Sequence, residues 1–269
     1  MIEEIIAKSK LDKESVGIFF IDNKLLISTI LNDHKLPFSE TVESLKLNII
    51  DLHLDAGLLV ASCVTKSADK NISLEDYYVC DIKKALLQMK PEDHHQILKN
   101  YHWLNWNKQS KYCGECGKQL IKIIDSTEKK CPSCNKSFFP RFSPAVLVLI
   151  YNEDKILLAR SPHFPPGDYS AIAGFIDVGE TAEQAAQREA KEELGIEIDD
   201  LKYFSSQTWP FPDSFMIAFT ARHSGGKLKI DPDEIEDARW FCKDDLPDMT
   251  PSASISRKLI HSFLEESID

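Results

Sequence analysis

The stretch GFIDVGETAEQAAQREAKEELGI, residues 174–196, predicts a short helix that carries three closely spaced glutamates. Residues 181–194 contain no proline or glycine and are rich in good helix formers, and Gly195 follows as a natural stop. At about 100° per residue, one side of this helix is small and apolar, made of Ala182, Ala185, Ala186, Ala190 and Leu194. Glu189 and Glu193 each follow an alanine by seven residues, which returns a helix to within about 20° of the same direction. Both carboxylates therefore point along the apolar side.

A run of charge on a helix usually forms a solvated face, here with ion pairs to Arg188 and Lys191. A solvated face should lie opposite the apolar side, whereas Glu189 and Glu193 share that side and Glu192 lies on its flank. Carboxylates that are held together and partly desolvated are costly unless a cation lies among them. Oxygen ligands suit Mg²⁺ or Mn²⁺, and these ions commonly bring a phosphate with them. The stretch therefore predicts a metal–phosphate site.

The same stretch resembles the Nudix box, G-x5-E-x7-R-E-U-x-E-E-x-G-U, in which U is a bulky apolar residue. It matches the box at Gly174, Glu180, Arg188, Glu189, Glu192, Glu193, Gly195 and Ile196. Ala190 is smaller than the aliphatic residue that the family often has at this place. The resemblance implies the Nudix fold and a metal-dependent hydrolase that cleaves a diphosphate linked to another moiety.

The chain of 269 residues is longer than one average domain, so two or three units are expected. Its net charge of −11 argues against non-specific binding to nucleic acid or to anionic membranes. A polyphosphate substrate then needs metal ions and a local basic group to bring it in. Residues 1–10 lack the cationic start and apolar core of a signal peptide, and no apolar run approaches the ~20 residues of a membrane span. We expect a cytoplasmic protein without a membrane segment.

Four of the seven cysteines form two C-x2-C pairs, which predicts a zinc site and a reducing compartment. Four thiolates complete a tetrahedron around one Zn²⁺ per chain, and they come from Cys113, Cys116, Cys131 and Cys134. Because no coordination position is left open, this zinc is expected to be structural. Zinc ribbons also bind nucleic acid, but this one carries acids among its lysines and lacks a basic–aromatic stripe. Cys63, Cys80 and Cys242 are interpreted as buried or inert thiols.

The fold class is expected to be α+β, in three units: an N-terminal mixed α/β domain over residues 1–110, a four-cysteine zinc ribbon over 111–141 and a Nudix α/β/α sandwich domain over 142–269. In the first unit, apolar runs predict strands within 16–28 and 55–64, and helical patterns cover 73–89 and 91–107. Pro91 suits the start of the second helix. Trp103 and Trp106 share one face of that helix and are interpreted as docking it onto a core. No chemistry is assigned to this unit.

The third unit is expected to hold the chemistry. Its predicted elements are a hairpin over residues 145–161 that turns at 152–154, a strand at 169–179, the helix at 181–194, further strands within 202–223 and at 237–242, and a final helix over 252–266. Strands and helices mixed in this way, with the box between a strand and a helix, predict a sheet with helices packed on it.

The segment SSQTWPFPDS, residues 205–214, predicts a stiff aromatic connection between two strands. Prolines restrict its backbone, and Trp209 and Phe211 flank Pro210, so that a flat ring could stack on a preformed apolar surface. The alternative is a loop whose aromatic side chains fill the core of the protein itself.

A C-x2-C ribbon, a Nudix box and then SQ-x-WPFP-x-S resemble, in this order, the NADH pyrophosphatase branch of the Nudix hydrolases, and the resemblance covers residues 101–269 well. The branch usually has proline where this chain has Thr208, and commonly tyrosine at the place of Phe139. The resemblance implies that NADH or NAD⁺ is split at its pyrophosphate into AMP and nicotinamide mononucleotide by a homodimer.

The resemblance also implies roles for individual residues. Glu189 and Glu193 are expected to be the principal Mg²⁺ or Mn²⁺ ligands, with Glu192 and the carbonyl of Ala173 beside them. Glu193 is expected to orient or deprotonate the attacking water, and Arg188 to pair with a box glutamate. Phe175 and Phe139 are expected to enclose the nicotinamide from two subunits. The other implied substrate-binding residues are Gln207, Thr208, Trp209, Pro210, Phe211, Pro212, Asp213, Ser214 and Ser256.

One further metal ligand is expected from the acidic stretch IDPDEIEDARW, residues 230–240. Mg²⁺ takes six oxygen ligands, and glutamates from one helix face leave a side of the metal uncovered. Glu234 occupies the place of the family's extra ligand, so we expect it to face the box helix and most of its acidic neighbours to be solvated. The alternative is a solvent-facing loop for all five acids: Asp231, Asp233, Glu234, Glu236 and Asp237.

Two other functions stay open. One is a Nudix hydrolase that acts on ADP-ribose or removes the cap of NAD-capped RNA. The other is a non-catalytic zinc-ribbon binding module with an inactive Nudix domain, and the intact Glu189, Glu192 and Glu193 weigh against it.

Overall fold

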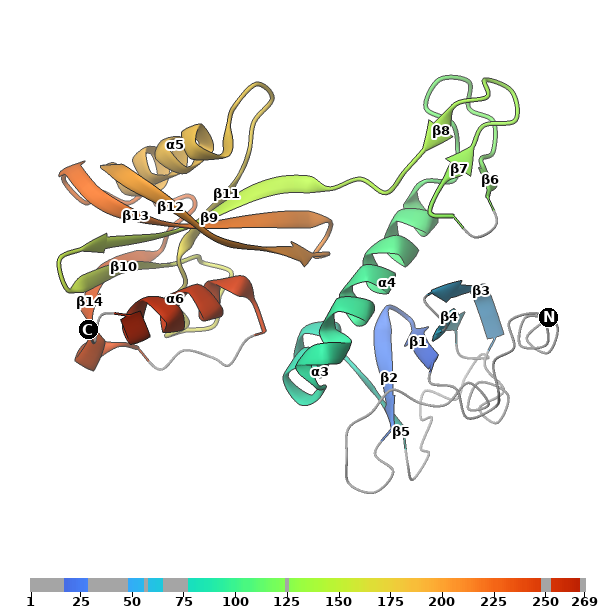
Figure 1. Ribbon diagram of the computed structural model, residues 1–269, viewed down its shortest axis with the longest axis horizontal. Helices are drawn as coiled ribbons and strands as arrows, with labels where there is room; N and C mark the ends of the chain where they lie inside the picture. Colours follow the sequence, from blue (N-terminus) through green and yellow to red (C-terminus); the bar gives the residue numbers. More distant parts are fainter. Residues whose placement is uncertain are drawn as a thin grey trace. The chain divides into compact units, whose positions relative to one another are not determined.

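The computed structural model describes residues 17–28, 48–55, 58–64, 77–123, 126–247 and 253–266, with only the backbone for 48–55, 58–59, 61–64 and 266. The chain divides into two compact units, residues 1–141 and 142–269. Figure 1 shows the elements of both units along the chain.

The first unit contains a five-stranded sheet in the order β3-β4-β1-β2-β5. Its strands are β1 (Gly17–Ile21), β2 (Lys24–Ser28), β3 (Asn48–Asp55), β4 (Leu58–Val64) and β5 (Tyr77–Cys80). β1 runs parallel to β4, and the other neighbouring pairs are antiparallel. The predicted run at 16–28 forms β1 and β2, whose two-residue turn places Asp22 and Asn23 at positive φ, as tight hairpins require.

Two helices follow this sheet, α3 (Ile82–Gln88) and α4 (Pro91–Gln109). Of the helix predicted for residues 73–89, residues 73–76 lie outside the described residues. The prediction is wrong for Tyr77–Cys80, which is strand β5 paired with β2, and its later part is observed as α3. The aromatic and β-branched sequence YYVC suits a strand, and Asp81 then caps α3 through the N–H of Lys83. The second helix starts at Pro91 as predicted.

The cysteine-rich segment forms a three-stranded sheet, β6 (Ile121–Lys122), β7 (Lys129–Lys130) and β8 (Ser137–Phe138). Lys129 joins it to the end of α4, since its Nζ donates to the carbonyls of Asn107 and Ser110 at 2.8 and 2.7 Å. Trp103 and Trp106 are buried, and the ammonium groups of Lys122 and Lys129 lie over their rings. Both tryptophans therefore pack at this junction, and a separate domain boundary at residue 110 stays a prediction.

The second unit is built on a six-stranded mixed sheet in the order β12-β13-β9-β10-β14, with β11 also paired to β9. Its strands are β9 (Ser143–Asn152), β10 (Lys155–Arg160), β11 (Ile172–Phe175), β12 (Ile196–Trp209), β13 (Ser214–Gly226) and β14 (Asp237–Cys242). β9 and β10 form the predicted hairpin, with Asn152 opposite Lys155. β13 runs parallel to β9.

Helices α5 (Ala182–Leu194) and α6 (Ile255–Glu266) cover opposite faces of this sheet (Figure 1). Alternate residues of the central strand β9 point to the two sides: Val146 and Val148 pack with α5, and Leu147 and Leu149 pack with α6. The 3₁₀ turn η2 (Lys243–Asp245) follows β14. The predicted α/β/α sandwich is confirmed, and its central strand is buried on both faces.

Candidate metal and substrate site

Helix α5 forms for local reasons. The hydroxyl of Thr181 accepts from the N–H of Gln184, and the side chain of Gln184 accepts from the N–H of Thr181, which is a complete capping box. At the other end, Gly195 adopts a left-handed conformation with φ of 69°, as the residue after a helix often does. Between them, Ala185, Ala186, Ala190 and Leu194 are fully buried.

Glu189 and Glu193 lie on this buried side of α5, with 7% and 6% of their surfaces exposed. Their carboxylate oxygens and one of Glu234 lie within 4.8 Å of one another. Glu192 faces solvent instead, and its Oε2 is 3.0 Å from Arg188. The structure thus brings together three of the four predicted carboxylate ligands and places Glu192 outside their cluster.

Arg188 connects the loop before α5 to the helix itself. Its guanidinium donates to both carboxylate oxygens of Glu180 at 2.7 and 2.9 Å, and to the carbonyl of Phe175 at 2.8 Å. It also donates to Glu189 at 2.8 Å and to Glu192 at 3.0 Å. These bonds lower the pKa of Glu180 and fix the direction of the Glu189 side chain.

Glu193 is the most perturbed acid of the cluster. Burial, followed by the charges of Glu189 and Glu234, raises its pKa to about 8. Its Oε2 is buried and has no hydrogen-bond partner in the described part of the chain. Burial likewise raises the pKa of Glu189. An all-oxygen cluster with an unsatisfied buried oxygen fits a hard divalent cation such as Mg²⁺ or Mn²⁺.

Glu234 reaches the cluster from the turn before β14. The N–H of Asp231 donates to the carbonyl of Glu193 at 2.9 Å, and Ile235 is buried in the core beside α5. Of its acidic neighbours, Asp233 and Glu236 are exposed, as expected, whereas Asp231 and Asp237 are half-buried. Glu236 pairs with Arg160 at 2.7 Å, and Asp237 accepts hydrogen bonds from Tyr169 and Arg239.

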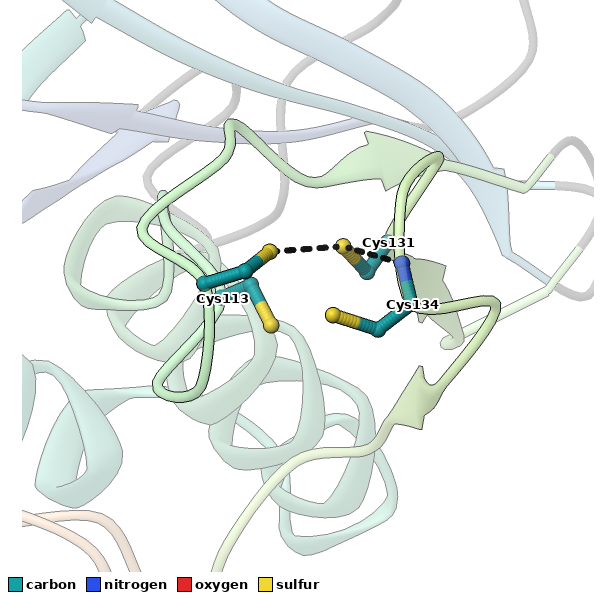
Figure 2. Close-up of side chains that lie close together, drawn as sticks. Cys113, Cys131 and Cys134 are labelled. Carbon is teal, nitrogen blue, oxygen red and sulfur yellow. Dashed lines mark hydrogen bonds between the residues drawn. The ribbon is translucent and has the colours of Figure 1, made fainter.

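The four cysteines of the ribbon form a second cluster, with all their sulfur atoms within 4.8 Å of one another. Figure 2 shows Cys113, Cys131 and Cys134 with their sulfur atoms directed to a common centre. The two C-x2-C turns are alike, since the N–H groups of Gly117 and Asn135 donate to the carbonyls of Cys113 and Cys131 at 2.9 and 3.0 Å. Gly117 and Asn135 both have positive φ. This repeated geometry fits a closed four-thiolate Zn²⁺ site.

The thiols of this cluster also differ in acidity. Backbone N–H groups, chiefly that of Cys134, lower the pKa of Cys131 to about 7. The neighbouring sulfur of Cys116, followed by burial, raises the pKa of Cys134 to about 12. Once one thiol has lost its proton, the others hold theirs more tightly, and a bound divalent cation would remove this penalty.

A family model described as the NUDIX domain matches residues 141–263. Residues 141–263 are a NUDIX domain. Its three clustered glutamates lie on or next to the box helix. A crystal structure of a NUDIX hydrolase from Nitrosomonas europaea matches 58% of this chain and 91% of its own, with a TM-score of 0.50 and 22% identity, so the fold is shared.

Curated relatives that match this chain carry the name NAD-capped RNA hydrolase NudC. The protein from Pseudomonas syringae pv. tomato is 45% identical over 161 residues, which are 60% of this chain and 58% of that protein. The protein from Chromobacterium violaceum is 47% identical over 150 residues, which are 56% of this chain and 57% of that protein. The chain therefore spans a little over half the length of the curated relatives it matches. Among the described helices, none is both long and apolar enough to cross a membrane.

In the NUDIX domain, residues 205–209 belong to the end of β12, residues 210–213 form the turn to β13, and Trp209 pairs with Ser214 across that turn. The rings of Trp209 and Phe211 meet edge to face, with their centroids 5.1 Å apart. Both rings are half-buried, Pro210 is buried and Pro212 is exposed. Part of each ring therefore packs against the domain, as the core-filling alternative requires, and part is accessible to a ligand.

The turn is fixed to the first residue of β9. The hydroxyl of Ser143 donates to Oδ1 of Asp213, and its N–H donates to the carbonyl of Asp213, both at 2.9 Å. Ser143 lies 70 residues away in the sequence and was not predicted. No local pattern could have identified it, because the contact depends on the parallel pairing of β9 with β13.

Gln207 and Ser256 hold helix α6 against the sheet of the NUDIX domain. The amide of Gln207 donates to the carbonyl of Ala253 at 3.1 Å and accepts from the N–H of Ile255 at 2.7 Å. Ser256 is buried, with its Oγ 2.7 Å from that of Ser170. These bonds give both side chains a structural role, and their direct contact with substrate stays a prediction.

The remaining predicted site residues lie at the surface of their own units. Ala173 and Phe175 belong to β11 beside the box loop, and both are exposed. Thr208 is half-buried on β12. Phe139 follows β8 in the first unit and is also exposed. Both phenylalanine rings are thus accessible for an aromatic ligand.

Proposed function

We propose that the chain hydrolyses the pyrophosphate bond of NADH or NAD⁺ and releases AMP and nicotinamide mononucleotide. The observation that carries this proposal is the convergence of Glu189, Glu193 and Glu234 within 4.8 Å on one side of α5. Carboxylates at this spacing repel one another unless a divalent cation lies among them. The name of these relatives, which refers to NAD-capped RNA, supports a substrate that contains a nicotinamide dinucleotide.

Mg²⁺ or Mn²⁺ bound to these carboxylates would offset charge on the pyrophosphate and lower the pKa of a water molecule. Glu193 orients the attacking water or takes its proton, as a general base does in hydrolysis. Arg188 keeps Glu189 in place through the hydrogen bond at 2.8 Å. The half-buried faces of Trp209 and Phe211 offer a stacking surface for one of the two rings of the substrate.

We further propose a homodimer in which Phe175 of one subunit and Phe139 of the other enclose the nicotinamide. The exposure of both rings, 54% and 57%, supports this arrangement. The four cysteines hold a structural Zn²⁺, and a reducing compartment such as the cytoplasm keeps their thiols available.

Removal of the cap from NAD-capped RNA is a second candidate, favoured by the name of the relatives. The two activities use the same bond and the same carboxylates, and the substrates differ only in the RNA chain attached to the adenosine ribose. The net charge of −11 disfavours a long RNA relative to the free dinucleotide.

One assay tests these candidates together. The release of AMP from NADH, NAD⁺ and ADP-ribose, and of 5′-phosphate RNA from NAD-capped RNA, is measured with Mg²⁺ or Mn²⁺ for the parent chain and for Glu193→Gln. We expect metal-dependent turnover, fastest with NADH or NAD⁺, that the variant loses. Faster turnover of ADP-ribose or of capped RNA would show that the proposed substrate is wrong. If none of the four compounds is turned over, the chain is a non-catalytic module.

A further inference from the structure

Arg160 and Glu236 form an ion pair next to the turn that carries Glu234. Nη1 of Arg160 lies 2.7 Å from Oε2 of Glu236, and the N–H of Glu236 donates to the carbonyl of Arg160 at 2.8 Å. The Arg160 side chain is 16% exposed, so its charge is partly shielded from solvent, while the Glu236 side chain is 49% exposed. The end of β10 therefore holds this turn through both backbone and side chain.

The same turn is fixed to α5 at its other end. The N–H of Asp231 donates to the carbonyl of Glu193 at 2.9 Å, and the N–H of Ile235 donates to the carbonyl of Asp231 at 2.8 Å. The side chain of Ile235 is 6% exposed and packs in the core with the alanines of α5. Glu234 thus lies between Asp231, which is hydrogen-bonded to the box helix, and Glu236, which contacts Arg160.

These contacts matter because Glu234 has to stay near two other carboxylates. Its oxygen lies within 4.8 Å of those of Glu189 and Glu193, where like charges repel. Glu234 is exposed, so packing of its own side chain does not oppose this repulsion. The backbone of the turn therefore decides which groups the Glu234 side chain can reach, and the contacts of Glu236 with Arg160 restrain that backbone.

We infer that Arg160, acting through Glu236, is a positioning residue that keeps Glu234 within reach of the divalent cation. This inference rests on the proposed function, because it needs a metal at the three carboxylates. A cation near a metal site weakens metal binding by simple electrostatics, so removing Arg160 should then strengthen it. Loss of a positioning contact has the opposite effect, and the sign of the change separates the two roles.

The experiment measures Mn²⁺ binding to the substrate-free full chain by electron paramagnetic resonance, without any turnover. We expect Arg160→Gln and Glu236→Gln each to weaken Mn²⁺ affinity by about 10-fold, the scale for residues that orient metal ligands. The double variant should bind Mn²⁺ no more weakly than Arg160→Gln, because both changes break the same contact. Thermal unfolding shows whether each variant is folded. If Arg160→Gln does not fold, Glu236→Gln tests the same contact, because Glu236 is exposed and its replacement should not disturb the core.

Asp233→Asn is the matched control, because it removes one acid from the same turn. Asp233 is exposed, and its carboxylate forms no ion pair with the described residues. Asp233→Asn should reduce Mn²⁺ affinity only slightly. The inference would be overturned if Arg160→Gln bound Mn²⁺ at least as tightly as the parent chain. It would also be overturned if Glu236→Gln and Asp233→Asn had the same Mn²⁺ affinity.

The proposed function fails in a different way. If Glu193→Gln binds Mn²⁺ as well as the parent chain does, then the three carboxylates do not hold the metal. If Glu193→Gln loses Mn²⁺ while Arg160→Gln and Glu236→Gln do not, the metal site stands and only the positioning role of Arg160 is overturned.

Discussion

The carboxylate of Glu189 lies against the α-carbon of Gly174, so closely that a β-carbon at residue 174 would be 1.9 Å from both Cδ and Oε1 of Glu189. Atoms that share no bond do not approach to this distance, and only glycine leaves room for the carboxylate. Arg188 holds Glu189 from the other side through a hydrogen bond of 2.8 Å. The close approach of Gly174 and the hydrogen bond from Arg188 thus together fix the position of the Glu189 carboxylate.

Gly174→Ala should therefore displace Glu189 and weaken binding of Mn²⁺ by about 10- to 100-fold, as loss of a ligand-orienting contact does. The measurement is Mn²⁺ binding to the substrate-free chain, with thermal unfolding to show that the fold is retained. Gly225→Ala is the control in the same domain, because its β-carbon would meet only the flexible end of Glu197, at 3.3 Å. Equal affinities for the parent and Gly174→Ala would contradict the prediction.

Glu193→Gln should lower kcat by roughly 10²–10⁴, the range for loss of a general base, with little change in KM because the shape is kept. Glu192→Gln should have a smaller effect, since Glu192 is exposed and pairs with Arg188 outside the three-carboxylate cluster. Steady-state kinetics on NADH compare the two variants. A near-normal kcat for Glu193→Gln would remove it from the mechanism, and equal losses would return Glu192 to the metal site.

The metal site should respond to pH through Glu193, whose pKa rises from 4.5 to about 8 because of burial and the nearby Glu189 and Glu234. Between these pH values the folded metal-free chain holds a proton that the unfolded chain releases. The contribution of Glu193 to the free energy of unfolding of the metal-free chain should therefore fall as the pH rises from 4.5 to about 8. Metal binding needs the ionised carboxylate, so Mn²⁺ should bind more tightly as the pH approaches 8 and should release a proton.

Calorimetry at pH 7 in two buffers with different ionisation enthalpies counts the released protons. Glu193→Gln is the control, because it has no proton to release at this position. Binding of Mn²⁺ to the parent chain without proton release at pH 7 would show that Glu193 is already ionised.

The ribbon should carry one tightly bound Zn²⁺ per chain, because the sulfur atoms of its four cysteines lie within 4.8 Å of one another. Cys116→Ser should lower the folding yield more than it changes substrate preference, since its Sγ is 3.5 Å from that of Cys131. Cys80→Ser, in the same unit but outside the cluster, should have little effect on zinc content. Metal analysis that finds no zinc in an active preparation would be inconsistent with this role.

Trp209→Ala should weaken dinucleotide binding by about 1–3 kcal/mol if the indole stacks on a ring of the substrate. Tyr203→Ala is a matched control, because Tyr203 lies on the same strand with its ring exposed. Binding of NADH and thermal unfolding are measured for both variants. If Trp209→Ala unfolds while its native fraction keeps a normal KM, the ring serves the core of the domain instead.

Elements that depend on neighbouring residues could be predicted from the sequence alone. The box helix was predicted over 181–194 and is observed as Ala182–Leu194, because its cap, its helix formers and its glycine stop all act within a few positions. The period of the helix also placed Glu189 and Glu193 correctly on the buried side. The spacing of the cysteines likewise identified the four-thiol cluster.

Tertiary structure decided what depends on distant parts of the chain. Tyr77–Cys80 became a strand because β2 offered a partner, although the surrounding pattern is helical. Gln207 bonds to Ala253, 46 residues away, and the pair of Arg160 and Glu236 requires β10 and β14 to lie side by side. Sequence periodicity specifies which face of an element is apolar, but the partner of a polar side chain is set only when the elements pack, because its energy depends on distance and burial in the folded chain.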